Sequence, residues 1–194
     1  NGKVQDVFGQ GSSYGENTLA TNARFKDISS LGLWYDSSSS QTKVIVNDRS
    51  GYMIKEFPVG GNINMIAGTG LQNGNPTKNV DALTTPINSD GSNSSTNNVN
   101  MLVDSSNGYV YKGQGATAHY VLQRAATSKW QDVITAGAGP FTNMDSDSLI
   151  GNPIAAGNVT FGNYAVTQFM GMSTNYMLML DHDYDSAAAQ HRGG

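Results

Sequence analysis

The chain contains no cysteine, few charged residues and few of the residues that favour helices. The absence of cysteine excludes disulfide bonds and metal sites built on thiolates. Charged residues make up only 13% of the 194 residues, and the net charge of −4 leaves no basic excess that would bind nucleic acid. Leu, Glu and Lys are scarce, which argues against a helical bundle. The composition therefore favours strands and turns.

Long apolar runs are missing as well. No run approaches the roughly eighteen residues that a membrane-spanning helix needs, and the nearest candidate, 176–180, has the length of a strand. We therefore expect no membrane span. The chain begins at Asn1 rather than at Met and opens without a signal-peptide pattern, so we expect a processed chain or a segment of a longer protein.

Small polar residues and glycine are abundant and separate short apolar runs. The chain holds 23 Gly, 20 Asn, 20 Ser and 15 Thr, which favour turns. The apolar runs between them have the length of strands and are bounded by Asn, Ser, Gly or Asp. This pattern predicts an all-β fold rather than a disordered linker. The clearest runs are 43–46, 101–103, 108–111, 120–122 and 176–180.

One hairpin is indicated by its turn residues. Asn107 and Gly108 separate the apolar run 101–103 from the run that begins at Tyr109. A two-residue type I′ turn needs positive φ at both central residues, and Asn-Gly is its preferred pair. We therefore expect a tight type I′ hairpin here.

An internal repeat organises the apolar runs. Three alternating segments each end in Gly-x-Gly, and their first glycines, Gly9, Gly68 and Gly137, lie 59 and 69 residues apart (68 − 9 and 137 − 68). Apolar runs follow in the same order after the first and second of these corners. Four short strands per unit is the arrangement of a β-propeller blade. The three segments are 3–11, 62–70 and 129–139.

The first complete unit resembles an NHL-type β-propeller repeat. An apolar strand that closes in Asp (31–36) is followed by a hydrophobic strand that ends near an Asp (44–49) and by a basic strand (52–57). The corner Ile66-Ala67-Gly68-Thr69-Gly70 carries the resemblance most specifically. The resemblance covers nearly the whole chain and weakens toward the C-terminus. It implies an all-β fold of four-stranded antiparallel blades.

The repeat divides the chain into four predicted parts. They are the outer strand of a blade completed elsewhere, two blade-like repeats, the second with a Ser/Asn/Gly-rich loop insertion, and a partial third repeat. About three blades are fewer than the four to eight of known propellers, so we expect an incomplete ring or part of a larger assembly, made with a second chain or with further blades. The parts are 1–11, 12–70, 71–139 with its insertion at 88–98, and 140–194.

A calcium site is one candidate for chemistry. Asp181, Asp183 and Asp185 stand at alternate positions, as oxygen ligands do in calcium loops. The run lacks glycine at its sixth position, Ser186, and an acidic residue at its twelfth, Arg192. A polar loop after a strand would show the same alternation, so both interpretations stay open.

Catalytic sites find little support. The lyases related to NHL propellers hold zinc with histidines from several blades, but no three positions here match such a set among His119, His182 and His191. No Gly-x-Ser-x-Gly nucleophile motif is present. Three aspartates close predicted strands, and we expect them to accept hydrogen bonds from turn amides. These are Asp36, Asp48 and Asp104.

Surface chemistry offers two further candidates. Sequons for N-glycosylation begin at Asn93 and Asn158, and Asn93 lies in the most loop-like segment. Several aromatic residues could line a sugar-binding surface, although aromatic residues at alternating strand positions more often pack between sheets. They are Trp34, Tyr35, Tyr109, Tyr111 and Trp130.

Together these patterns predict a non-enzymatic, extracellular or cell-surface β-propeller module with a structural or adhesive role, which assembles with copies of itself or with other protein chains. Two alternatives stay open. One is a propeller enzyme of the lyase or hydrolase kind, or a ligand-binding propeller, that uses calcium or another metal at its central channel. The other is a secreted carbohydrate-binding module with glycans as partners.

Overall fold

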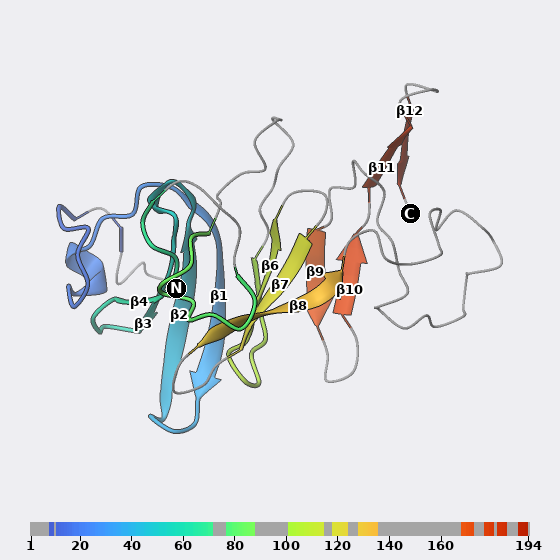
Figure 1. Ribbon diagram of the computed structural model, residues 1–194. Coiled ribbons are helices and arrows are strands. Elements are labelled where there is room, and N and C mark those ends of the chain that lie inside the picture. Colours follow the sequence, from blue (N-terminus) through green and yellow to red (C-terminus); the bar gives the residue numbers. More distant parts are fainter. Residues whose placement is uncertain are drawn as a thin grey trace, which may run out of the picture.

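The computed structural model is an all-β protein, as the composition predicts (Figure 1). The described residues form two four-stranded antiparallel sheets, two two-stranded sheets and two short 3₁₀ turns, η1 (Ala20–Asn22) and η2 (Arg49–Gly51). The structure describes residues 8–9, 11–71, 77–87, 101–114, 118–123, 128–135, 168–172, 177–180, 182–185 and 190–193.

Both four-stranded sheets are meanders whose strands follow one another in chain order. Such local pairing suits strands joined by short polar turns. Sheet 1 consists of β1 (Ile28–Asp36), β2 (Gln41–Asp48), β3 (Met53–Pro58) and β4 (Asn64–Ala67). Sheet 2 consists of β5 (Met101–Val103), β6 (Val110–Gln114), β7 (Ala118–Gln123) and β8 (Lys129–Thr135).

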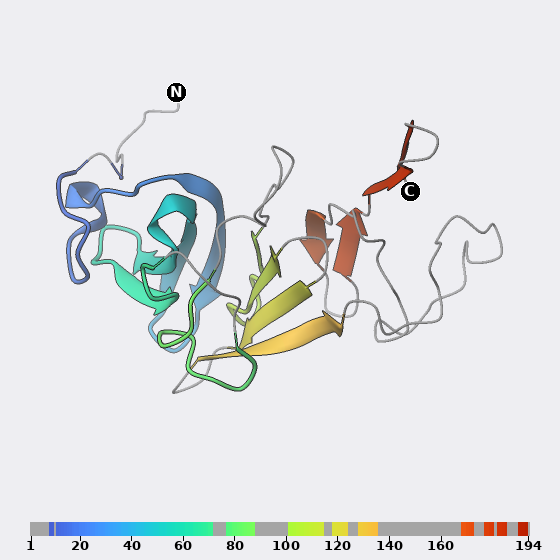
Figure 2. The same cartoon turned by 45° about the horizontal axis from the view of Figure 1, so that its top comes forward.

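Two smaller sheets follow toward the C-terminus. Strand β9 (Gln168–Met172) pairs with β10 (Met177–Leu180), and β11 (His182–Asp185) pairs with β12 (Gln190–Gly193). Strand β9 contacts β5 and β6 of sheet 2. The sheets therefore succeed one another in space in the order of the chain, as Figures 1 and 2 both show.

Sheet 1 is apolar on both faces. Successive residues of a strand lie on opposite faces, so Val44 and Val46 lie on one face and Ile45 on the other. The face of Ile45, called the inner face here, shares a core with sheet 2 that includes Leu122 and the fully buried Trp130. The outer face, that of Val44 and Val46, forms a second core with the N-terminal segment. This second core also contains Ala20, Ala23, Phe25, Phe57 and Ile63, with Phe8 packed against it.

Two glycines allow sheets 1 and 2 to approach closely. A Cβ atom at Gly32 on β1 would collide with the side chain of Val103 on β5. At Gly108, a Cβ atom would lie 2.6 Å from the ring of Trp34. Both glycines lie where the two sheets face each other. The sheets can come this close because neither glycine has a side chain.

The segments that precede the two sheets are themselves repeats, related by a shift of 59 residues. Gly9 and Gly68 share left-handed φ angles of 89° and 93°. Leu19 forms an isolated bridge with Asn62, just before β4, and Lys78 forms one with Trp130 in β8. Each segment therefore runs beside the last strand of the sheet that follows it. The identical pairs are Gly9/Gly68, Gly11/Gly70, Gly15/Gly74, Thr18/Thr77, Ala23/Ala82 and Ile28/Ile87.

The β1–β2 and β5–β6 hairpins share one loop design, shifted by 68 residues. In each, an aspartate side chain accepts the backbone N–H and the hydroxyl of the serine two residues later: Asp36 from Ser38, and Asp104 from Ser106. The fourth loop residue is left-handed, Ser40 at φ 54° in one loop and Gly108 at φ 72° in the other.

This design corrects the predicted type I′ turn at Asn107–Gly108. The loop spans four residues, 105–108, because Asp104 and Tyr109 form the closing backbone pair and Gly108 N–H donates to the Asp104 carbonyl. Only Gly108 has positive φ; Asn107 instead accepts the N–H of Tyr109 with its side-chain oxygen. The Asp104 side chain favours the longer loop because it holds Ser106 as well.

The predicted parts of the chain map onto these sheets as follows. Sheet 1 lies within 12–70 and sheet 2 within 71–139. Of the strand predicted in 1–11, the structure describes residues 8, 9 and 11, which form no strand. The insertion at 88–98 lies outside the described residues. The described residues show no closed ring of blades, so the propeller arrangement stays a proposal.

Glycine substitutions separate backbone strain from sheet packing. We expect Gly108→Ala to destabilise the fold more than Gly60→Ala. Both glycines have φ near 75°, but a Cβ at Gly60 meets nothing within 4 Å, whereas one at Gly108 meets Trp34.

Conversely, Ser40→Gly should raise the free energy of unfolding by about 1 kcal/mol, because glycine adopts left-handed φ without penalty. Urea unfolding measures all three variants, and equal losses at Gly60 and Gly108 would contradict the close approach of the sheets.

Candidate functional site

A buried ion pair anchors the N-terminal segment to the outer face of sheet 1. The Nζ of Lys55 lies 2.8 Å from Oδ2 of Asp48, with side chains 2% and 0% exposed. The other carboxylate oxygen of Asp48 accepts the backbone N–H groups of Lys26 and Asp27, at 3.0 and 3.1 Å. One carboxylate therefore joins β2, β3 and the segment that leads into β1.

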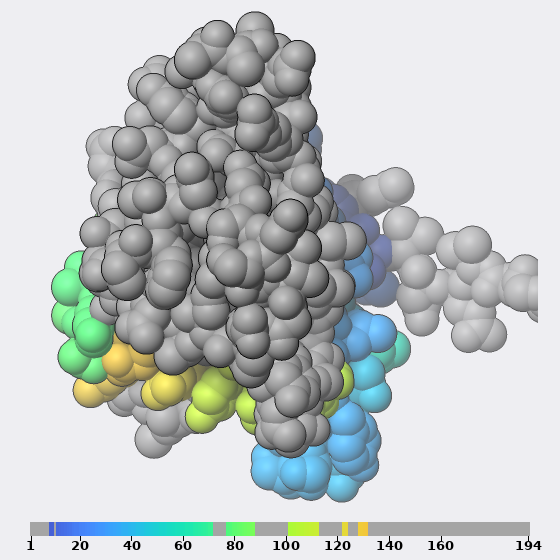
Figure 3. Space-filling model, turned by 90° about the vertical axis from the view of Figure 1, so that its right-hand side faces the viewer, coloured from blue at the N-terminus to red at the C-terminus, as the bar shows by residue number. Residues whose placement is uncertain are grey.

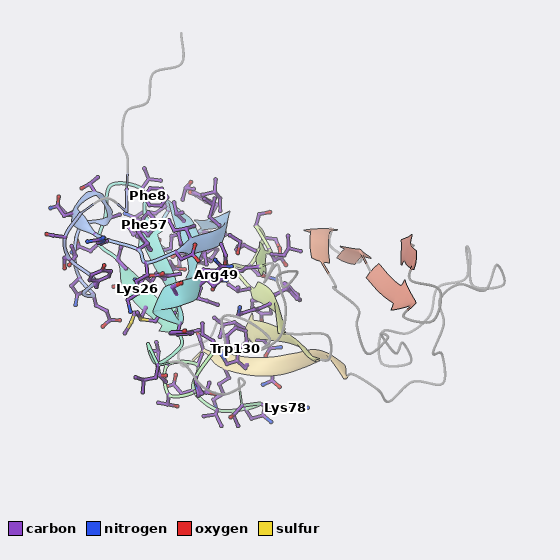
Figure 4. The ribbon with its side chains drawn as sticks, turned by 90° about the horizontal axis from the view of Figure 1, so that it is seen from above. Phe8, Lys26, Arg49, Phe57, Lys78 and Trp130 are labelled. Carbon is purple, nitrogen blue, oxygen red and sulfur yellow. The ribbon has the colours of Figure 1, made fainter. Side chains whose placement is uncertain are left out.

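Aromatic side chains cover this ion pair. Lys55 Nζ lies 4.9 Å from the ring centroid of Phe25, within the range of a cation–π interaction. Phe8 packs edge-on against Phe25 and Phe57, with centroids 5.9 and 5.1 Å apart. Figure 4 shows Phe8 beside Phe57 and Trp130 well apart from them, toward sheet 2. The cover excludes water and strengthens the pairing of the charges.

A second charged cluster lies on the inner face, at the base of the β1–β2 hairpin. Lys43 Nζ lies 2.9 Å from Asp36 and 3.3 Å from Glu56. Glu56 also accepts the indole N–H of Trp34 at 3.2 Å, and the Lys43 ammonium lies 5.6 Å from the Trp34 ring centroid. Each of these charges serves the packing of the hairpin. In Figure 3 the light-blue atoms of this hairpin form the lowest part of the molecule.

Hydrogen bonds shift the proton affinities in this cluster. The pKa of Asp36 lies well below its ordinary value of 3.8 because the hydroxyls of Ser38 and Ser39 and the ammonium of Lys43 donate to its carboxylate. Partial burial alone would lower the pKa of Lys43, but the hydrogen bond to Asp36 and the charge of Glu56 outweigh it and raise that pKa. Both groups therefore stay ionised over a wide pH range.

An apolar stripe on the outer face of sheet 1 is exposed. Leu31, Leu33 and Tyr35 alternate along β1 and are 55%, 53% and 55% exposed. The register places Leu31 and Leu33 opposite Val46 and Val44, which lie on the outer face. These three residues are called the outer stripe. An ordered, uncharged row on a sheet face is the feature of this structure most suited to binding another protein surface.

The predicted metal and glycan sites fall mostly where the structure gives no side-chain detail. Asp183 and Asp185 lie in strand β11 rather than in a loop, and Asp181 lies outside the described residues. Asn93 and Asn158 lie outside them too. Within the described part of the chain, no group of three or more His, Asp or Glu is placed to hold a metal ion. Calcium at 181–185 therefore stays a prediction.

The predicted aromatic surface is divided between different environments. Trp130 is fully buried in the core, and Trp34 is half-buried against Gly108. Tyr35 lies on the face opposite Trp34 because the two are neighbours in β1. Tyr111 is half-buried, and burial followed by the nearby charge of Asp104 raises its pKa. Trp34 and Trp130 thus pack between the sheets.

The predicted role of the strand-ending aspartates, accepting turn amides, is confirmed for Asp36 and Asp104 but not for Asp48. Asp36 and Asp104 accept amides of their own turns, and Asp48 accepts amides of the segment before β1. Sequence reasoning missed the Lys55 partner and the outer stripe. Both have a signal in the sequence. Lys55 interrupts an otherwise apolar face of its strand. The alternating apolar residues at 31, 33 and 35 form one face of a strand, which needs a neighbour to cover it.

Scans of the chain against protein-family models, curated proteins and solved structures gave no significant match. In the described residues, no helix is long and apolar enough to cross a membrane.

Removing one partner of the buried ion pair should cost far more than removing an exposed one. We expect Lys55→Met to lower the free energy of unfolding by roughly 3–5 kcal/mol, because Asp48 is left charged and buried. The matched control is Arg49→Met. It breaks the half-exposed pair with Asp27 and should cost at most about 1 kcal/mol. Urea unfolding compares the two, and similar losses would show that the Asp48–Lys55 pair does not anchor the segment.

The Asp36 carboxylate should make the protein sensitive to acid. Its folded-state pKa lies below the ordinary 3.8, so its contribution to stability is fully present above that value and is lost as pH falls toward the folded-state pKa. We therefore expect the stability of Asp36→Asn to fall less than that of the wild type between neutral pH and about pH 2. Asp81→Asn controls for the loss of one negative charge. Parallel stability curves for Asp36→Asn and the wild type would refute this role.

Proposed function

We propose that the chain is a non-enzymatic, extracellular structural or adhesive module of the β-propeller type, which works through contacts between sheet faces. The packing of sheets 1 and 2 supports this most: two four-stranded meanders share one apolar core. Propeller blades are built from such sheets, placed one after another around an axis. The repeated hairpin loops and the repeated segments before the sheets support the same plan.

The use of the charged residues fits this role. Asp48 and Lys55 hold the N-terminal segment, and Lys43 bridges Asp36 and Glu56 within one hairpin. These charges stabilise the sheets, while the exposed face of β1 is apolar. A surface of this kind binds through shape and apolar contact, and its natural partners are other protein chains or further sheets of the same kind.

A calcium-binding or ligand-binding propeller is the second candidate. Residues 183 and 185 occupy alternate positions of β11, and alternate positions share one face of a strand. This placement supports a shared oxygen-ligand site, with Asp181 as its third proposed member. The two candidates differ in whether binding needs a metal ion.

Bead aggregation tests adhesion directly. Beads coated with the full chain should cluster, whereas beads coated with an unrelated protein of similar charge should not. Clustering that persists in a chelator supports contact between sheet faces, because no metal is needed. Clustering abolished by the chelator and restored by calcium would favour the second candidate, and the triple variant Asp181→Asn/Asp183→Asn/Asp185→Asn should then fail to cluster. Beads that never cluster would contradict self-adhesion.

A further inference from the structure

The outer face of sheet 1 is covered over only part of its width. The N-terminal segment packs over β2, β3 and β4 through Phe8, Phe25 and the Asp48–Lys55 pair. Strand β1 lies beyond this cover, which leaves the outer stripe exposed. Val59, directly after β3, extends the exposed area: it donates its N–H to the Thr42 carbonyl and is 69% exposed. Thr42 pairs with Tyr35, so Tyr35, Thr42 and Val59 form one row across the sheet.

The face of sheet 2 that corresponds to the outer face of sheet 1 is covered. The loops of the two hairpins align with a shift of 68 residues (104 − 36), which places Met101 at the position of Leu33 and Val103 at that of Tyr35. Met101 is 7% exposed, and Val103 packs against the core shared with sheet 1.

The neighbouring row agrees with this match. Val110 corresponds to Thr42 and pairs with Leu122, which therefore corresponds to Val59. Val110 and Leu122 are both completely buried, whereas Val59 is 69% exposed. The cover over these positions of sheet 2 is the inner face of sheet 1. The packing of sheet 2 against sheet 1 therefore shows, within this chain, how a face of this kind is covered. The outer stripe has no such cover.

We propose that the outer stripe docks against the β9–β10 sheet of a second copy of this chain, in a head-to-tail arrangement. This deepens the proposed function, on which it rests, by naming the two surfaces and the partner. The contact repeats the packing of sheet 1 on sheet 2, with the stripe of one copy in the place of Met101 and Val103.

The β9–β10 sheet fits as the occupant because it continues the same succession of sheets. Strand β9 lies against β5 and β6, as sheet 2 lies against sheet 1. Strand β10 consists only of Met and Leu, and Met177 and Leu178 occupy opposite faces because they are neighbours in the strand. An unbroken apolar run of this kind is typical of a strand that packs inside an assembly of sheets. Strand β9 brings this sheet against sheet 2, and the uncharged sequence of β10 matches the uncharged stripe.

A head-to-tail contact joins two different surfaces, so in this arrangement each copy binds one neighbour through its stripe and another through its β9–β10 sheet until a ring closes. Two copies that satisfy each other's faces form a closed dimer. Copies that do not close form longer chains. Stripe-to-stripe packing around a two-fold axis would instead use one surface twice, and the experiment below separates these arrangements.

Light scattering on the full chain over a wide concentration range tests the stripe. We expect the wild type to self-associate and Leu31→Asn/Leu33→Asn to associate at least about tenfold more weakly, because polar amides replace the centre of the contact. Leu83→Asn, at a residue 44% exposed in the segment before sheet 2, is the matched control and should associate like the wild type. Circular dichroism and urea unfolding establish that the variants fold, since the replaced side chains are exposed.

Cross-linking identifies the partner surface, and the absence of native cysteine makes it unambiguous. Under mild oxidation, Leu33→Cys mixed with either Met177→Cys or Leu178→Cys should form a mixed disulfide. Only one of the two β10 variants should react, because the two positions lie on opposite faces. Leu83→Cys should give no such product.

The outcomes separate this inference from the proposed function. A mixed Leu33–β10 disulfide, with association lost in the stripe variant, supports it. A Leu33→Cys product linked only to itself, association unchanged by the stripe variant, or a wild type that stays monomeric overturns it. The bead assay judges adhesion independently: beads that cluster equally with stripe-variant protein would leave adhesion standing while the docking surface fails.

Discussion

The fold depends on one constraint: a four-stranded sheet that is apolar on both faces must be covered on both faces. Sheet 1 meets it with two different partners, sheet 2 on its inner face and the N-terminal segment on most of its outer face. The cores built around Ile45 and Val46 are thus made by neighbouring residues of one strand. Because β2 is buried on both sides, its sequence reads as a continuous apolar run rather than an alternating one.

Polar groups determine the position of the elements that cover sheet 1. Apolar contact has no direction, so it cannot by itself fix the position of the N-terminal segment over sheet 1. Asp48 supplies that direction, since its carboxylate holds two backbone amides of the segment and the ammonium of Lys55 at once. The hairpin loops work in the same way through Asp36 and Asp104. Three aspartates therefore place the elements that the apolar cores hold together.

Local patterns predicted much of the fold, and long-range contacts escaped them. The all-β class and the strands of both large sheets follow from short apolar runs between turn residues, and the role of Asp36 and Asp104 follows from their position at strand ends. The type I′ turn was wrong because the Asp104 side chain competes for the loop amides. The Lys55 partner of Asp48 depends on pairing between β2 and β3, and the exposure of Leu33 depends on which face lacks a neighbour. The sequence signals at 55 and at 31–35 can therefore be interpreted only once the strand pairing and the covered face are known.

The strand order has a mechanical consequence. In both large sheets each strand pairs with the next one along the chain, and the pairing is antiparallel throughout. Tension along the chain then loads the hydrogen bonds between neighbouring strands one pair at a time, as in a zipper, instead of shearing many at once. The close contact between Gly32 on β1 and Val103 on β5 then opposes the release of β1, because β1 can leave sheet 1 only after the two sheets have separated.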